Sequence, residues 1–99
     1  MAEIVLLHSA DVNIQRAYEW FESWNEGAGD IFLEDLDRLL GLLANFPEMG
    51  SIVYGRRRRF IMREYNYGVF YTLTGQRVLV SNVLDLRQDP AAIRKELDE

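Results

Sequence analysis

Residues 55–63 read Gly-Arg-Arg-Arg-Arg-Phe-Ile-Met-Arg and hold five of the ten arginines of an otherwise acidic chain. The side chains at the end of this stretch alternate, with Phe60 and Met62 on one side and Arg59, Ile61 and Arg63 on the other. An alternation of period two is typical of a β-strand, whose successive side chains point to opposite faces of a sheet. The stretch therefore predicts a strand that carries guanidinium groups on the face turned away from the core.

The half of the chain before this strand predicts one strand and two helices. The run of branched apolar residues over 3–7 is typical of a short buried strand. Apolar side chains at steps of three and four predict amphipathic helices over 10–24 and 28–45, with Ser9 as the N-cap of the first. Residues 51–55 are expected to form a loop. The apolar stripe of the first helix is Ile14, Ala17, Tyr18, Phe21 and Trp24, and Trp20 lies off it.

The second half of the chain predicts the rest of a small α+β domain. Strands over 58–64, 67–73 and 77–86 are joined by short links, so we expect an antiparallel meander. A short helix over 91–97 follows. The expected order is β-α-α-β-β-β-α, in which a helical hairpin packs on one face of a small, mainly antiparallel sheet. The last strand should be covered on both faces, and the sheet face that carries Arg59 and Arg63 should remain open.

Length and composition favour a single globular domain and argue against a membrane-spanning or disulfide-bonded protein. Ninety-nine residues with 48% hydrophobic content predict a single domain over residues 1–99. No apolar run approaches the roughly 20 residues of a membrane-spanning helix, and the N-terminus lacks the pattern of a signal peptide. There is no cysteine and one histidine, so we expect no disulfide, no metal site and no cofactor. A cytoplasmic protein without membrane contact is expected.

Charge is distributed unevenly along the chain. Residues 1–50 carry two basic groups against ten acids, a net charge of −8, whereas residues 51–99 carry nine basic groups against six acids, a net charge of +3. Such asymmetry indicates an anionic partner for the second half. Arginine supplies a planar fork for carboxylate or phosphate. The preference for arginine over lysine has an alternative explanation in the base composition of the genome.

Several features in a fixed order resemble a known family. An initial strand and a helical hairpin precede a Phe-Pro-x-x-Gly turn at residues 46–50, then the arginine-rich strand, then Tyr67 and Tyr71, and finally Val-Leu-Asp-Leu-Arg-Gln-Asp-Pro at residues 83–90. This set resembles the RelE/ParE superfamily of toxins from bacterial type II toxin–antitoxin operons, and more closely its ParE, plasmid-stabilisation branch. The resemblance covers nearly the whole chain.

The resemblance implies a small cytoplasmic toxin that a cognate antitoxin holds inactive. The free toxin would inhibit growth, either by ribosome-dependent mRNA cleavage in the RelE branch or by poisoning DNA gyrase in the ParE branch. The basic positions of the ribonucleases fall on Arg59, Ile61, Gly68 and Arg87, and no tyrosine follows Arg87 where the ribonucleases often have one. A histidine common in the plasmid-stabilisation branch is replaced by Asp85. The incomplete acid–base set favours a toxin that does not cleave RNA.

The arginines are the candidate residues for binding a target or an antitoxin. Antitoxins of this family often wrap the toxin with an acidic segment, which suits bidentate, charge-assisted contacts from guanidinium groups. The alternative is a solvated rim that pairs with the acidic helices of the same chain. The candidates are Arg56, Arg57, Arg58, Arg59, Arg63 and Arg87.

Other residues have a weaker claim to function. Arg87 and Asp85 could form a site at the end of the sheet, although a structural ion pair is favoured. His8 is the only histidine, and its place at a strand end favours a structural role. We expect Trp20 and Trp24 to lie at an edge where a partner helix or a second copy docks. The tyrosines at positions 65, 67 and 71 are expected to pack in the core rather than stack on bases.

Three functions remain open. The first is a toxin that binds its target, with DNA gyrase as a candidate, and is neutralised by an antitoxin. The second is a ribosome-dependent endoribonuclease in which Arg59 and Arg87 contact the phosphate of mRNA as candidate catalytic residues. The third is a degenerate relative that has lost toxicity and acts only as a binding partner. A homodimer and a toxin–antitoxin hetero-oligomer are both compatible with the sequence.

Overall fold

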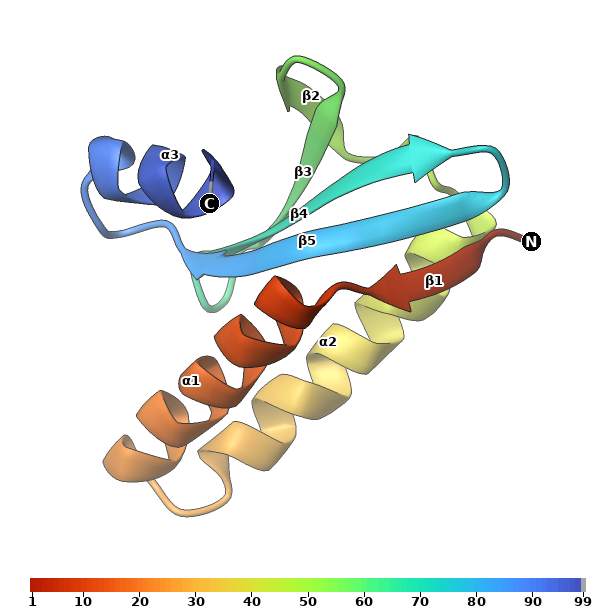
Figure 1. Cartoon of the computed structure of the whole chain (residues 1–99). Coiled ribbons are helices and arrows are strands. Elements are labelled where there is room, and N and C mark those ends of the chain that lie inside the picture. The colour runs from red at the N-terminus through yellow and green to blue at the C-terminus, as the bar shows by residue number, and fades with distance from the viewer. Residues whose placement is uncertain (99) are drawn as a thin grey trace.

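A five-stranded mixed sheet runs through the middle of the computed structural model, which describes residues 1–98 (Figure 1). The strand order is β1-β5-β4-β3-β2; β1 pairs with β5 in parallel, and the other neighbours are antiparallel. The α+β class and the meander of β3, β4 and β5 are therefore confirmed. The strands are β1 Glu3–Leu6, β2 Ser51–Tyr54, β3 Arg57–Met62, β4 Tyr67–Thr74 and β5 Arg77–Asp85.

Two long helices form a hairpin on one face of this sheet. α1 (His8–Trp24) and α2 (Ala28–Asn45) run antiparallel, and the end of the hairpin where they join projects well beyond the sheet (Figure 1). The helices come close where α2 begins, because Gly29 has no side chain. A Cβ atom at this position would lie 2.7 Å from Tyr18 Cδ1 and 2.8 Å from the Tyr18 carbonyl oxygen.

The main core lies between the hairpin and the sheet. Alternate side chains of β4 and β5 point into it, as the period of a strand requires. Full burial of each such aliphatic or aromatic side chain is worth about 1.5–3 kcal/mol. The most deeply buried members are Ala10 of α1, Phe32 and Leu43 of α2, Val69 and Tyr71 of β4, and Val78, Val80 and Val83 of β5.

A smaller core lies on the opposite face of the sheet, beneath α3 (Pro90–Asp98). Ile93 and Leu97 of α3 pack there with Phe70 and Leu84. The expectation that this face would remain open is therefore wrong. The short helix was expected at nearly the right residues, but its local pattern does not say which surface its two apolar side chains cover.

Three local expectations are also wrong. Helix α1 begins at His8 after Leu7, so Ser9 is inside the first turn and is not the N-cap. The Ser9 hydroxyl instead donates a hydrogen bond of 2.6 Å to the Ser81 carbonyl oxygen of β5. The segment over 51–55, expected as a loop, contains β2, which pairs with β3. Trp24, expected on the buried stripe, is 73% exposed.

Polar side chains of α1 fix this helix on an irregular part of β5. The register with β4 shifts between Phe70 and Tyr71, so Ser81 is an extra residue in β5. Next to it, the buried Asn13 Oδ1 atom accepts hydrogen bonds from Asn82 Nδ2 (3.0 Å) and from the Val83 backbone N–H (3.1 Å). These bonds pair polar groups that are buried between α1 and β5, and they hold the helix against the end of the strand.

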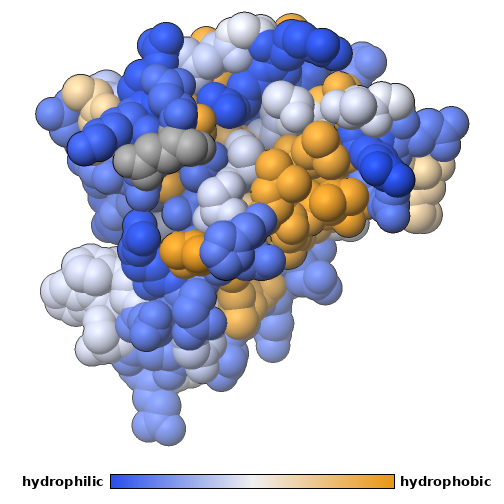
Figure 2. Space-filling model, in the orientation of Figure 1, coloured by the Kyte–Doolittle hydropathy of each residue, from blue (hydrophilic) through white to orange (hydrophobic). Residues whose placement is uncertain are grey.

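The edge of the sheet formed by β1 carries partly exposed apolar side chains, among them Leu6 and Leu7. Figure 2 shows hydrophobic residues gathered over β5 and the adjoining end of β1. Within residues 1–98, no helix is both long enough and apolar enough to cross a membrane.

Candidate functional site

The arginine run divides between the two faces of the sheet because β3 alternates. Arg57 and Arg59 point to the face that carries α3, whereas Arg58 points to the face that carries the helical hairpin. The Arg58 Nη1 atom donates to the carbonyl oxygens of Glu48 (3.1 Å) and Gly50 (2.8 Å). Arg58 therefore holds the turn after α2 in place and is less available to a partner. Arg56 lies in the turn before β3 and is exposed.

Arg57 and Arg59 are the members of the run with unused hydrogen-bonding groups. Both side chains are half-buried, and the Nε atom of each is buried without a partner in the part of the chain that the structure describes. A buried donor without a partner costs about 1–3 kcal/mol. Across residues 1–98 neither residue forms an ion pair, so the alternative of internal pairing with the acidic helices does not apply to them.

Arg94 of α3 extends this basic surface. Its guanidinium carbon lies 4.6 Å from the ring centroid of Tyr54, and Tyr54 is the cross-strand partner of Arg57. We call the surface formed by Arg56, Arg57, Arg59 and Arg94 the arginine edge. The sequence reasoning missed Arg94 because it did not place α3 on this face.

Arg63 is not part of the arginine edge. Strand β3 ends at Met62, and Arg63 lies in the turn that follows, so the expectation that it shares a sheet face with Arg59 is wrong. It lines a shallow hollow together with Asp35 and Arg38 of α2, on the side of the helical hairpin.

Arg87 forms an ion pair with Asp85 at the end of β5. Its Nε atom lies 2.9 Å from Asp85 Oδ1, its Nη2 atom 2.9 Å from Oδ2, and its backbone N–H donates to Oδ1 at 2.9 Å. The side-chain hydrogen bonds from Arg87 hold the pKa of Asp85 below its usual value, and the same bonds raise the pKa of Arg87.

The position where a ribonuclease would carry an arginine, Gly68, is enclosed by neighbouring side chains. A Cβ atom on Gly68 would lie 3.0 Å from Leu86 Cδ2, 3.1 Å from Phe70 Cε1 and 3.3 Å from Arg59 Cδ. The other such position is Ile61. This part of the sheet therefore presents hydrocarbon where acid–base catalysis of RNA cleavage would need basic groups.

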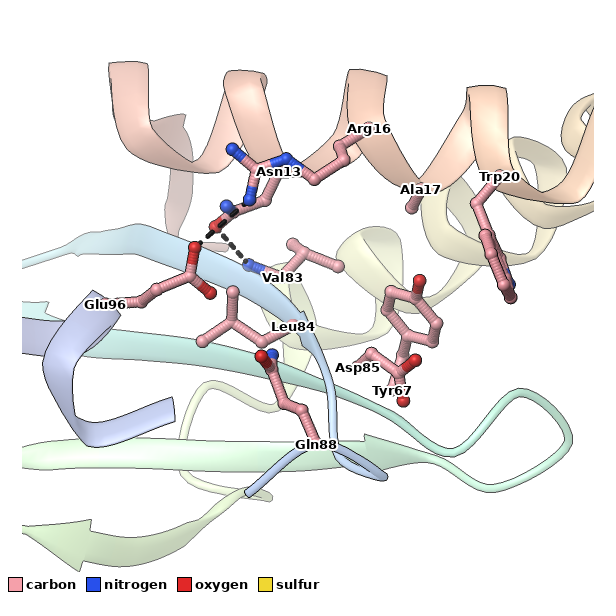
Figure 3. Close-up of a pocket in the computed structure, with 10 residues that line it drawn as sticks. All are labelled: Asn13, Arg16, Ala17, Trp20, Tyr67, Val83, Leu84, Asp85, Gln88 and Glu96. Carbon is pink, nitrogen blue, oxygen red and sulfur yellow. Dashed lines mark hydrogen bonds and ion pairs between the residues drawn. The ribbon is translucent and has the colours of Figure 1, made fainter. Parts of the chain in front are cut away.

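A pocket of about 260 Å³ lies between α1 and the ends of β4 and β5 (Figure 3). An ion pair of 3.1 Å between Arg16 of α1 and Glu96 of α3 bridges one side of it. The Tyr67 hydroxyl group reaches the pocket and makes no hydrogen bond to another group in residues 1–98. Burial raises the pKa of Tyr67, and the Asp85 carboxylate raises it further. The lining residues are Asn13, Arg16, Ala17, Trp20, Tyr67, Val83, Leu84, Asp85, Gln88 and Glu96.

The remaining tyrosines pack as expected from the sequence. Tyr71 is fully buried, and its hydroxyl donates to the Pro47 carbonyl oxygen (2.9 Å) and accepts from the Gly50 N–H (2.8 Å). Tyr65 stacks edge-on against Phe32 and donates a hydrogen bond to Asp35. Burial, together with that bond to Asp35, raises the pKa of Tyr65 to about 12.

His8 and the tryptophans lie apart from the arginine edge. His8 is the exposed first residue of α1. Trp20 and Trp24 are exposed on the last turns of α1, with ring centroids 5.7 Å apart, and the docking of a partner there stays a prediction. Among residues 1–98, no group of three or more metal-ligating side chains of His, Cys, Asp or Glu comes together.

Comparison with known proteins gives one family and one fold. The family model described as "ParE toxin of type II toxin-antitoxin system, parDE" matches residues 4–90. A solved structure titled "Chromosomal ParDE TA system from P. aeruginosa" superposes with a TM-score of 0.66 at 6% identity, covering 88% of this chain and 98% of that chain. At this identity the structural match shows the fold alone. No curated protein matches the sequence.

Proposed function

Because the chain belongs to the ParE toxin family of type II toxin–antitoxin systems, we propose that it arrests growth by binding a target protein and that a cognate antitoxin neutralises it. DNA gyrase, the target that the ParE branch implies, is the first candidate. The toxin would act in the cytoplasm and would be stored as a hetero-oligomer with its antitoxin.

The surroundings of Gly68 support binding rather than RNA cleavage. Leu86, Phe70 and the aliphatic part of Arg59 already fill the space that an added side chain would need. General acid–base catalysis needs titratable groups within hydrogen-bonding reach of the reacting atoms. The Arg87 guanidinium donates two hydrogen bonds to Asp85, and Ile61 carries no proton-transferring group. A surface without the groups for acid–base catalysis is better suited to binding another protein.

The arginine edge is the proposed site for the antitoxin. Guanidinium groups bind carboxylates bidentately, and each hydrogen bond that involves a charged group contributes about 1.5–3 kcal/mol. Arg57 and Arg59 form no ion pair within residues 1–98, so their guanidinium charges remain available to an acidic antitoxin segment.

Induced expression tests the proposal. We expect the wild-type protein to arrest growth and co-expression of the antitoxin encoded beside it to restore growth. Purified Arg57→Gln/Arg59→Gln protein should bind this antitoxin at least tenfold more weakly by calorimetry. Arg77→Gln is the matched control, because Arg77 is an exposed arginine at the start of β5, and within residues 1–98 its ion pair is with Glu3 of β1. Absence of growth arrest would overturn the toxin proposal, and equal affinity of the two variants would overturn the assignment of the antitoxin site.

A further inference from the structure

The joined end of the helical hairpin carries both tryptophans of the chain. Trp20 is 46% exposed and Trp24 is 73% exposed, and the two rings meet edge-to-face on one side of α1. Tryptophan is among the residues most enriched where binding energy concentrates in interfaces, because it buries a large rigid surface. The exposed parts of the two rings form one apolar surface that a partner can bury.

The charge near the tryptophans is mainly negative, and the one basic side chain that lines the pocket beside Trp20, Arg16, is paired with Glu96. Between Arg16 and Arg38 the chain has no basic residue and seven acids, which are Glu19, Glu22, Glu26, Asp30, Glu34, Asp35 and Asp37. Glu22 is used internally, where its carboxylate accepts hydrogen bonds from the N–H groups of Gly27 and Gly29. Glu19, Glu26 and Asp30 are exposed. This surface repels an acidic segment and attracts a cationic one.

The joined end of the helical hairpin is also ordered before a partner binds. The two bonds to Glu22 measure 3.1 Å and 2.8 Å and fix the link between the helices, and the close contact at Gly29 fixes their separation. A surface that is already ordered loses little conformational entropy when a partner docks.

The pocket beside Trp20 continues the same surface. Figure 3 shows Trp20 of α1 at one end of the pocket, with Tyr67, Asp85 and Gln88 along its floor. Its volume of about 260 Å³ lies below the range of about 300–1,000 Å³ usual for small-molecule sites, which suits one long side chain. The Tyr67 hydroxyl and the Gln88 amide oxygen can accept hydrogen bonds, whereas the Asp85 carboxylate is already paired with Arg87. A tryptophan ring is the best partner for a guanidinium or ammonium group.

We propose that Trp20, Trp24 and this pocket bind an arginine- or lysine-bearing segment of a protein partner. One basic side chain enters the pocket beside Trp20, and a neighbouring basic group lies over Trp24 near Glu26. If the proposed function holds, this partner is the target, because an acidic antitoxin segment is attracted to the arginine edge and repelled here. A second copy that offers its own arginine edge is the competing occupant, although such a head-to-tail contact does not close into a symmetric dimer.

A peptide titration tests the chemistry of the site without any assay of toxicity. The probes are a 12-residue peptide with four arginines and the same peptide with citrulline, which has nearly the shape of arginine but no charge. The chain has two tryptophans, both at the site, so their emission reports binding directly. We expect a saturable change with the arginine peptide that weakens as salt is added, and at least tenfold weaker binding of the citrulline peptide.

Variants locate the peptide on the surface. Tyr67→Phe and Glu26→Gln should each weaken binding about threefold to tenfold, whereas Glu48→Gln, an exposed acid beyond the opposite end of α2, should leave it unchanged. Equal binding of both peptides, or no effect of Tyr67→Phe and Glu26→Gln, would overturn the proposal. An emission change on concentrating the protein alone would show that a second copy is the occupant and would overturn it as well.

The assignment to the target has its own test. Trp20→Ala/Trp24→Ala should lose growth arrest while keeping antitoxin affinity within about twofold. Persistent growth arrest, or loss of antitoxin binding, would contradict the assignment. A wild-type protein without toxicity would refute the proposed function alone, because the peptide titration stands independently of it.

Discussion

At the scale of single residues, three tyrosines differ in the hydrogen-bond partners of their hydroxyl groups. Tyr65, Tyr67 and Tyr71 all line the space between the hairpin and the sheet, yet their hydroxyl groups differ. Tyr71 bonds the turn after α2, Tyr65 bonds Asp35, and the Tyr67 hydroxyl reaches an open pocket. The cost of removing each oxygen therefore depends on the partner that it leaves behind.

Replacing Tyr71 by phenylalanine should destabilise the fold more than replacing Tyr67. Tyr71→Phe leaves the Gly50 N–H and the Pro47 carbonyl oxygen without their partner, at a cost of about 1–3 kcal/mol. Tyr67→Phe removes a hydroxyl that bonds to no other group in residues 1–98, so we expect a change within about 0.5 kcal/mol. Urea denaturation measures both, and equal losses would contradict the hydrogen-bond assignment.

The ion pair at the end of β5 should contribute to stability in acid. The hydrogen bonds from Arg87 lower the pKa of Asp85, so in the folded state this carboxyl stays ionised to lower pH than in the unfolded chain. The resulting stabilisation is present above the ordinary pKa of about 3.9 and is lost as pH falls through the depressed value. Arg87→Gln should move the Asp85 pKa upward in an NMR titration. An unchanged pKa would show that Arg87 is not its cause.

Alternation of residues was enough to predict on which side Phe60, Met62 and Arg59 lie. It was not enough to predict the use of Arg58, because the carbonyl groups that bind it come from a turn about ten residues earlier. Asn13 was missed for a similar reason. It is buried because β5 has an extra residue at Ser81, and nothing in the run of apolar side chains marks that irregularity.

At the scale of elements, long periodic segments were predictable and short ones were not. The boundaries of α2 match the expected range over 28–45, because its apolar stripe is long and Gly27 and Pro47 flank it. β2 has four residues and pairs through a shifted register, so its own sequence carries little signal. The position of α3 depends on contacts with residues far along the chain, and so the covered face could not be foreseen.

Helix α3 should open more easily than the sheet. It has nine residues, fewer than an isolated helix needs in water, and is held mainly by Ile93, Leu97, the Arg16–Glu96 pair and the contact of Arg94 with Tyr54. We expect its amide hydrogens to exchange at a lower opening free energy than those of β4 in native-state hydrogen exchange. Leu97→Ala should speed exchange in α3 and leave β4 protected. Equal protection of α3 and β4 in the wild-type protein would contradict this view.

At the scale of the whole molecule, the basic and acidic halves of the sequence form two separate surfaces of opposite charge. The basic groups of Arg56, Arg57, Arg59 and Arg94 gather where β2, β3 and α3 meet, and the acids gather on the helical hairpin. Opposite charges on separate surfaces allow two partners of opposite charge to be recognised without competition for the same side chains. The arrangement agrees with the proposal of one surface for the antitoxin and another for the target.

The proposed toxin acts by binding a target and does not cleave RNA. The most direct measurement adds purified protein to translating ribosomes with a defined mRNA and, in parallel, to a DNA gyrase supercoiling reaction. We predict intact mRNA, and inhibited supercoiling that the antitoxin reverses. Cleavage of the mRNA that is abolished by Arg59→Ala or Arg87→Ala would contradict the account.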